Sequence, residues 1–412
     1  MKVVLPFVFI PASGGCKRYI ELVKVSKKFN VEYIIIIFGK GVKNKIKNLD
    51  KYCKLYFVDE EISLRELIDF RTFLYVIRMN KLINITKKVI VEEDPDLVLS
   101  FTWSPLLVYL SFKSSNERYP WTLNMQSFLP YEPVVWHIGT VKRLARIYSN
   151  KGFVIPIRDK AIKLIYKFPE YQYYFNHLIP KTFSFSVNPL TPYFLGLINR
   201  NLEKKTLPLI PSNGVNFNEI RKIEPREKEF DVFIFGRKEP IDSIFIAEKL
   251  LSDNSSLKIA LYIPMLTRKN TYLLDSLKRR FPKNRFCLIS APYIPERDLI
   301  SYILSSSLTV YPTLYESFSL FILNSLALGK PVITYNLLPL YAIYAYTPAV
   351  IRAPRNFDWI AYKVKKVLYS EDFYKLSEQA KGFAFRFAWD QVMKAEKNIY
   401  NNIIHLFEYA VK

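Results

Sequence analysis

Cysteine is scarce in this 412-residue chain, and no run of apolar residues is long. Cys16, Cys53 and Cys287 are widely spaced and odd in number, so neither a disulfide framework nor a zinc knuckle is expected, and a reducing compartment is the default. The longest apolar runs, 31–38 and 106–112, are much shorter than the ~20 residues that a membrane-spanning helix needs. The sequence therefore predicts a globular, cytoplasmic protein.

Histidine is equally scarce, and the sequence shows no internal repeat or low-complexity segment. His137, His177 and His405 lack the spacing of metal ligands, so each is expected to be structural. Apolar residues make up 50% of the chain and charged residues 24%, which is typical of a protein that buries large cores. The length is enough for two domains of ordinary size.

The chain is strongly basic, with a formal net charge of +23. Residues 1–210 hold 32 Lys and Arg against 17 Asp and Glu, a net of +15, and residues 211–412 hold 28 against 20, a net of +8. This excess fits nucleic acid, an anionic membrane surface or a phosphorylated substrate as partner, and it equally fits a solvated lysine-rich surface. High Lys, Ile and Tyr also resemble the composition of thermophile proteins.

The beginning of the chain predicts a β-α-β unit. Residues 2–10 predict a buried strand, 11–15 a tight loop, 16–29 a helix with an apolar stripe, and 31–38 a second strand. A signal peptide with a lipid-modified cysteine would explain the same letters, but the apolar region is short and contains Pro6. A β-α-β opening is typical of a nucleotide-binding parallel sheet.

The stretch 308–336 has the most informative pattern. Residues 308–311 predict a buried strand, a polar turn follows, apolar residues recur at helical spacing from Leu320 to Gly329, and 332–334 predict another strand. A helix that begins at the carboxyl end of a strand offers unpaired N–H groups and a positive dipole end to an anion. Glu316 lies in the turn, where a carboxylate is better suited to accept hydrogen bonds from sugar hydroxyls than to bind phosphate.

This stretch resembles the signature of GT-B glycosyltransferases, particularly glycosyltransferase family 4, whose pattern is P-S-x-x-E-G-F-G-x-x-x-x-E-A-x-A-x-G-x-P-V. The corresponding positions here include Pro312, Glu316, Ser317, Phe318, Ser319, Asn324, Gly329, Pro331 and Val332, of which Ser317 and Ser319 replace glycines. The family has a second glutamate, which holds the nucleotide ribose, where this chain has Asn324. Asparagine can hydrogen-bond a diol, but without a charge.

Three further segments carry the resemblance. Gly14-Gly15 stands where the family has a glycine pair after its first strand, and glycine lets a backbone approach a substrate or phosphate closely. Asp94-Pro95 precedes a strand expected at 96–101 and is interpreted as a strand entry rather than a metal motif. Residues 210–216 resemble the family's interdomain turn "IPNGVD".

The sequence also departs from the family. Arg237 matches the arginine of the family's "GR" pair on the donor diphosphate, but the lysine expected five residues later is Asp242, so Lys238 is the candidate substitute. After the strand expected at 121–123 the family often has a histidine near the reaction centre, and residues 124–127 contain none.

The resemblance implies an α/β protein with the GT-B fold, in which two Rossmann-like domains with doubly wound parallel sheets face a central cleft. We expect an acceptor-side N-terminal domain over 1–211 and a nucleotide-sugar-binding domain over 212–388. A C-terminal helix over 389–412 is expected to pack back on the N-terminal domain.

The resemblance also implies a retaining glycosyltransferase of the hexosyltransferase type, which moves a sugar from a nucleotide-diphosphate sugar to an acceptor without a metal or other cofactor. Departure of a nucleoside diphosphate needs charge neutralisation rather than a nucleophile. Glu316 and Arg237 are the expected catalytic residues. The expected donor-binding residues are Gly14, Gly15, Lys238, Ser317, Phe318, Ser319, Leu320 and Asn324.

Residues 140–180 are basic and aromatic, and at helical spacing they give a basic face beside an apolar one. Such a helix could rest on the cytoplasmic face of an anionic membrane, near a lipid-linked acceptor. The alternative is an ordinary amphipathic helix whose apolar side is core. The acceptor is accordingly expected to be a glycan or a lipid-linked sugar.

Three alternatives stay open. A nucleotide-sugar 2-epimerase shares the GT-B fold, but such enzymes carry additional histidines and carboxylates in the cleft. A degenerate, non-catalytic binding or scaffold protein is favoured by Asn324 and by the missing lysine and histidine. A nucleic-acid-binding protein would fit the charge, but no recognisable motif supports it. The donor sugar, the base, the acceptor and the oligomeric state are not predicted by the sequence.

Overall fold

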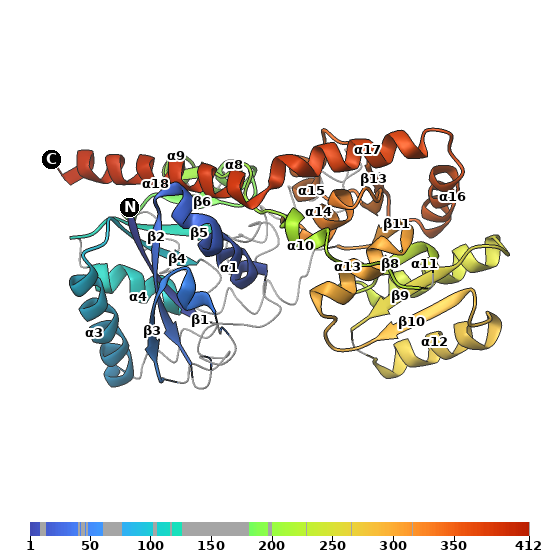
Figure 1. Cartoon of the computed structure of the whole chain (residues 1–412), viewed down its shortest axis with the longest axis horizontal. Coiled ribbons are helices and arrows are strands. Elements are labelled where there is room, and N and C mark those ends of the chain that lie inside the picture. The colour runs from blue at the N-terminus through green and yellow to red at the C-terminus, as the bar shows by residue number, and fades with distance from the viewer. Residues whose placement is uncertain are drawn as a thin grey trace. The chain divides into compact units, whose positions relative to one another are not determined.

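The computed structural model describes residues 1–8, 14–39, 42, 46, 48–60, 76–101, 105–115, 118–125, 181–196, 200–227, 229–264, 266–314 and 316–411. These residues form two compact units, which are drawn in Figure 1. The first unit holds the described residues of 1–125 and 181–214 together with 389–411, and the second holds those of 215–388. The segment 140–180, His137 and His177 lie outside the described residues.

The first unit is built on one parallel sheet with the strand order β3-β2-β1-β4-β5-β6-β7. The strands are β1 (Lys2–Val8), β2 (Glu32–Phe38), β3 (Lys54–Val58), β4 (Leu97–Phe101), β5 (Trp121–Met125), β6 (Ser184–Ser186) and β7 (Thr206–Pro208). In β1 and β2 every residue after the first is buried, which is why both strands are almost continuously apolar.

Helices connect these strands, and the C-terminal helix joins the same unit. They are α1 (Gly14–Ser26), η1 (Lys27–Phe29), η3 (Leu49–Lys51), α3 (Val76–Glu93), α4 (Pro105–Ser115), α8 (Thr191–Gly196), α9 (Arg200–Lys204) and α18 (Trp389–Val411). The prediction that the loop extends to residue 15 is wrong, because Gly14 and Gly15 belong to the first turn of α1. α18 packs against α1.

The second unit has a parallel sheet with the order β10-β9-β8-β11-β12-β13. Its strands are β8 (Phe230–Phe235), β9 (Ile259–Ile263), β10 (Phe286–Ser290), β11 (Ser306–Tyr311), β12 (Val332–Tyr335) and β13 (Val350–Ala353). Its helices are α10 (Phe217–Ile220), α11 (Pro240–Asp253), α12 (Arg268–Arg280), α13 (Glu296–Leu304), α14 (Leu320–Ala327), α15 (Leu338–Tyr344), α16 (Phe357–Leu368), α17 (Phe373–Ala384) and η8 (Phe385–Phe387).

Helices cover both faces of this second sheet. The connection from β8 to β9 runs in one direction along the sheet and the connection from β11 to β12 runs in the other, so right-handed crossovers place α11 and α14 on opposite faces. α11 packs against α12 and α16, while α14 packs against α13 and α17. The predicted α/β fold with two doubly wound parallel sheets is confirmed. The strand, helix and strand expected within 308–336 are β11, α14 and β12.

The two units separate in sequence between Gly214 and Val215. A Cβ at Gly214 would come within 2.7 Å of the Trp389 ring, so this position has no room for a side chain. The N–H of Val215 donates to the carbonyl of Phe387 at 2.8 Å, at the other end of the second unit. The expected boundary was after residue 211, three residues earlier.

Candidate functional site

The loops that follow β8 and β11 lie at the same edge of the second sheet. The two strands are neighbours in the sheet, with Val232 beside Leu308 and Ile234 beside Val310. The strand order reverses between them, with β9 and β10 on one side and β12 and β13 on the other. Open parallel sheets bind ligands outside the carboxyl ends of the strands at such a reversal. The loops 236–239 and 312–319 therefore mark the candidate site.

The side chain of Glu316, in the β11–α14 loop, is 15% exposed. Its Oε2 accepts a hydrogen bond from Lys238 Nζ at 2.9 Å and another from the Tyr311 hydroxyl at 2.9 Å. Its Oε1 accepts a longer bond, 3.3 Å, from the N–H of Ser317. Because Lys238 follows β8 and Tyr311 ends β11, this carboxylate joins the ends of the two strands.

These contacts keep the Glu316 carboxyl ionised. Burial alone would raise its pKa, but the charge of Lys238 and the hydrogen bonds from Lys238, Tyr311 and Ser317 outweigh burial, and the pKa is lowered. Burial raises the pKa of the Tyr311 hydroxyl well above its ordinary value, and the negative charge of Glu316 raises it further. At neutral pH the tyrosine is therefore a neutral donor to a carboxylate.

Helix α14 begins four residues after Glu316. The N-cap residue, Ser319, accepts from the N–H of Ile322 through Oγ at 3.3 Å and from the N–H of Leu323 through its carbonyl at 3.2 Å. Within the described part of the chain, the N–H groups of Leu320 and Phe321 have no acceptor. Two N–H groups at a helix N-terminus are thus available to an anion beside the ionised carboxylate.

Ser319 adopts a backbone conformation that favours glycine, with φ 68° and ψ 93°. The family signature has glycine at this position. The hydroxyl of Tyr344 donates to the Ser319 carbonyl at 3.1 Å, which holds the loop in this conformation.

We expect Ser319→Gly to stabilise the protein by up to about 1 kcal/mol. Relief of left-handed strain is worth ~1–2 kcal/mol, whereas replacing a serine cap by glycine costs a few tenths, roughly 0.3 kcal/mol, and added backbone entropy offsets part of the rest. Ser319→Ala keeps the strain and loses the cap, so it should cost about 1 kcal/mol. Urea unfolding of both variants checks this order, and a more stable alanine variant would contradict it.

Other residues of the signature have different surroundings. The ring of Phe318 is buried against Tyr344 and Phe387, each with ring centroids 5.9 Å apart, so its side chain anchors the loop to the core. Asn324 lies in the second turn of α14 with 5% of its surface exposed, and Leu320 begins that helix. Of Phe318, therefore, only the backbone is suited to ligand contact.

Gly236 and Arg237 form the start of the loop after β8. A Cβ at Gly236 would come within 2.7 Å of the Tyr262 carbonyl, so the close approach of β8 and β9 requires glycine. Arg237 is exposed. Burial raises the pKa of the hydroxyls of Tyr262 and Tyr311, and the positive charge of Arg237 opposes the rise in both, which places this charge at the ends of β9 and β11.

Asp242, which stands at the family's lysine position, is a buried partner of a different cation. Its carboxylate accepts two hydrogen bonds from Arg355, Nε to Oδ2 at 2.9 Å and Nη2 to Oδ1 at 3.0 Å. It also accepts from the Tyr335 hydroxyl at 2.6 Å. The Nζ of Lys238, the candidate substitute for that lysine, donates a hydrogen bond to Glu316.

Gly14 and Gly15 belong to the first unit and make none of the contacts described above. The structure thus gathers Glu316, Ser317 and Lys238 around one carboxylate, next to Ser319 and Leu320.

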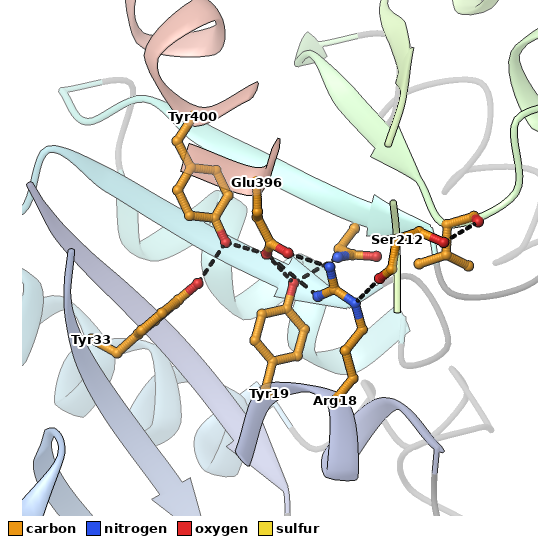
Figure 2. A network of polar contacts seen from close by, with 8 residues as sticks. Arg18, Tyr19, Tyr33, Ser212, Glu396 and Tyr400 are labelled. Atoms are coloured by element: carbon orange, nitrogen blue, oxygen red, sulfur yellow. Dashed lines mark hydrogen bonds and ion pairs between the residues drawn. The ribbon is translucent and has the colours of Figure 1, made fainter. Parts of the chain in front are cut away.

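A buried polar cluster in the first unit was not predicted from the sequence (Figure 2). Arg18 of α1 and Glu396 of α18 form an ion pair in which both side chains are 0% exposed. Arg18 Nε donates to the Ser212 carbonyl at 2.7 Å. The hydroxyls of Tyr19 and Tyr400 both donate to Glu396 Oε1, the first at 3.1 Å.

Two more side chains extend this cluster into the sheet. The hydroxyls of Tyr33 on β2 and Tyr400 are 2.9 Å apart, and Asn124 Nδ2 on β5 donates to the Tyr19 hydroxyl at 2.7 Å. Burial alone would lower the pKa of Arg18, but the Glu396 carboxylate raises it above its ordinary value. The cluster therefore fixes α18 to the rest of the first unit.

The sequence did contain one signal for this cluster. Glu396 interrupts the buried apolar stripe of α18, and a charge on such a stripe needs a buried partner. The stripe consists of Val392, Met393, Ile399, Tyr400 and Ile403.

No group of His, Cys, Asp or Glu side chains suited to a metal ion occurs among the described residues. In the same part of the chain, none of the helices has the length and apolar character needed to cross a membrane.

Residues 280–382 match the family model described as glycosyl transferases group 1. The matched segment contains β11, the Glu316 loop, α14 and β12. The match confirms the resemblance over the part of the second unit that carries the candidate site. Among curated proteins, none matches this sequence.

Solved structures of similar fold span nearly the whole chain. A glycosyltransferase from Rickettsia africae is 15% identical, with a TM-score of 0.68 and 98% of each chain covered. Anabaena HepE, solved in complex with UDP and glucose, is 13% identical, with a TM-score of 0.64 over 98% of this chain and 99% of that chain.

An enzyme of another reaction is also similar. The UDP-GlcNAc 2-epimerase from Neisseria meningitidis, solved bound to UDP-GlcNAc, is 12% identical, with a TM-score of 0.59 over 97% of this chain and 99% of that chain. Identities this low show a shared fold, which is the predicted GT-B fold, and leave the reaction to be argued from the site.

Proposed function

We propose that the protein is a glycosyltransferase that moves a sugar from a nucleoside-diphosphate sugar to an acceptor. The observation that carries the proposal is the ionised Glu316 carboxylate beside the N-terminus of α14, where the strand order of the second sheet reverses. The match of residues 280–382 to glycosyl transferases group 1 supports it. The complex of Anabaena HepE with UDP and glucose supports a nucleotide-sugar donor.

The two parts of the site suit the two ends of such a donor. The N–H groups of Leu320 and Phe321 and the dipole of α14 would bind the diphosphate, and the guanidinium of Arg237 would add a full positive charge. Neutralising the nucleoside diphosphate as it leaves lowers the barrier to its departure. Glu316 would accept hydrogen bonds from the sugar and stabilise the positive charge that develops at the reacting carbon, and Asn324 would bind the ribose.

The remaining features follow from the resemblance. We propose transfer with retention of anomeric configuration and without a metal ion, because Arg237 and α14 supply the charge. Gly14 and Gly15 would let the first unit approach the substrate with its backbone. The acceptor would be a glycan or a lipid-linked sugar at the cytoplasmic face of a membrane. The basic segment 140–180, which suggested a membrane surface, lies outside the described residues.

A second candidate is a protein that binds nucleotide sugars without turning them over. Lys238 Nζ is bonded to Glu316, and an acidic residue, Asp242, stands at the position where the family has a lysine. Fewer positive charges than in the family would then face the leaving group.

Incubation with UDP-, GDP- and ADP-sugars distinguishes these functions. We expect release of a nucleoside diphosphate from one donor class, in the presence of EDTA, and loss of release in Glu316→Ala. Analysis of the sugar product separates transfer from 2-epimerisation. Nucleotide binding without any release would favour the binding protein, and a salt-sensitive shift of DNA without nucleotide-sugar binding would favour a nucleic-acid-binding protein.

A further inference from the structure

The carboxylate of Glu316 is held by two side chains that no motif of the sequence had linked to it. Lys238 and Tyr311 donate to the same oxygen, Oε2, at 2.9 Å each. A carboxylate oxygen has two lone pairs, so Oε2 has its full set of donors. Within the described part of the chain, Oε1 accepts one bond, at 3.3 Å, from the N–H of Ser317. The second acceptor position of Oε1 is therefore the one left for a ligand.

The hydroxyl of Tyr311 has a fixed position because its ring is part of the core. Tyr311 is 2% exposed, and its ring packs against Phe235 and Phe321, with centroids 5.6 Å and 5.1 Å away. Phe235 and Phe321 are stacked on each other at 4.4 Å. The Tyr311 hydroxyl, which donates to Glu316, is thus held in place by residues of β8, β11 and α14.

Lys238 supplies the positive charge that the neutral hydroxyl of Tyr311 lacks. Its side chain is 26% exposed, less than that of Lys249 at 38%, a lysine of the same unit that pairs with Asp358 on the surface. Two other groups act near the carboxylate. Arg237 acts on the Tyr311 hydroxyl, and Tyr344, whose hydroxyl binds the Ser319 carbonyl, is acted on by the charge of Glu316.

We propose that Lys238 and Tyr311 are positioning residues, which turn the Glu316 carboxylate so that Oε1 faces the sugar of the donor. The inference rests on the proposed function, since it assigns Glu316 to the sugar. It also removes Lys238 from the diphosphate, where the sequence had placed it. Lys238 then acts through Glu316 and makes no contact with the donor.

The test compares the binding of a nucleoside diphosphate with the turnover of the whole donor in Lys238→Met and Tyr311→Phe. A positioning role leaves the affinity for the free nucleoside diphosphate, measured by titration calorimetry, at the wild-type value, because this ligand has no sugar. Turnover should fall about tenfold in Lys238→Met, which removes a charged hydrogen bond, and less in Tyr311→Phe, which removes a neutral one. Lys238→Arg should recover most of the loss, and Lys249→Met is the matched lysine control with wild-type turnover.

The pH dependence gives an independent signature. With Lys238 removed, burial of Glu316 is less opposed, so its pKa rises and more of the carboxyl is protonated at a given pH. The acid limb of the pH–rate profile should therefore move to higher pH in Lys238→Met. The same rise should appear in the carbon NMR titration of Glu316, assigned with Glu316→Gln, whether or not the protein turns over a donor.

The outcomes separate this inference from the proposed function. If the wild-type protein neither binds nor turns over any donor, the proposed function fails. If the NMR titration of Glu316 is also unchanged in Lys238→Met and Tyr311→Phe, the inference that these two residues position Glu316 is wrong as well. If Lys238→Met weakens binding of the free nucleoside diphosphate as much as it lowers turnover, Lys238 is a diphosphate ligand and the inference is wrong. Tyr311→Phe changes one hydroxyl and keeps the ring, so folding is retained in at least one variant.

Discussion

Replacing Glu396 by alanine should lower the free energy of unfolding of the first unit by about 3–5 kcal/mol. Its carboxylate is fully buried and accepts hydrogen bonds from Arg18, Tyr19 and Tyr400. Without it, the guanidinium of Arg18 would remain buried with no negative partner, and that desolvation cost is the reason for the large loss. Urea unfolding followed by circular dichroism measures the change.

Two controls give this prediction its specificity. Asp390→Ala removes another carboxylate of α18, which pairs with Lys28 at 3.3 Å but is exposed, so it should cost less than about 1 kcal/mol. The double variant Arg18→Met, Glu396→Leu removes both charges and should be much more stable than Glu396→Ala, because no charge is left unpaired. Equal losses for Glu396→Ala and Asp390→Ala would contradict a role of the buried pair.

Replacing Arg237 by glutamine should lower donor turnover by about 10²–10³-fold. The guanidinium lies on the loop after β8 and would be the full positive charge that faces the diphosphate as it leaves. Because the diphosphate is charged before and after transfer, binding of the free nucleoside diphosphate should weaken as well. Initial rates of nucleoside-diphosphate release, together with calorimetry, measure both effects.

A matched control tests whether charge alone explains the loss. Arg279 is exposed on α12 of the same unit, so Arg279→Gln removes an equal charge far along the chain from the loop and should keep wild-type rates. Arg237→Lys keeps the charge but not the planar fork, and it should retain an intermediate rate. Turnover that is unchanged in Arg237→Gln would mean that the leaving group is neutralised by other residues.

The sequence predicted those parts of the site that are local. Residues 308–334 alternate between a short apolar run, a polar turn and a helical stripe, and the structure has a strand, a loop and a helix at these places. Ser319 is an example of a backbone conformation that a local sequence pattern indicates. The family signature has glycine there, and the φ of 68° explains why.

The parts that were not predicted depend on residues that are distant in the chain. Lys238 and Glu316 are 78 residues apart and meet only because β8 and β11 are neighbours in the sheet. Arg18 and Glu396 are 378 residues apart. No periodicity connects such pairs, since register and sheet order are set by the whole fold. β13 was not predicted either.

Hydrogen exchange in the presence of UDP, GDP and ADP tests most directly whether the second unit binds a nucleoside diphosphate at α14. We predict that one of them slows exchange of the amides of Leu320 and Phe321 and of the loop after β8, in the wild-type protein and less so in Arg237→Gln. Protection confined to other parts of the chain, or no protection by any of the three at saturating concentration, would contradict the assignment of this site.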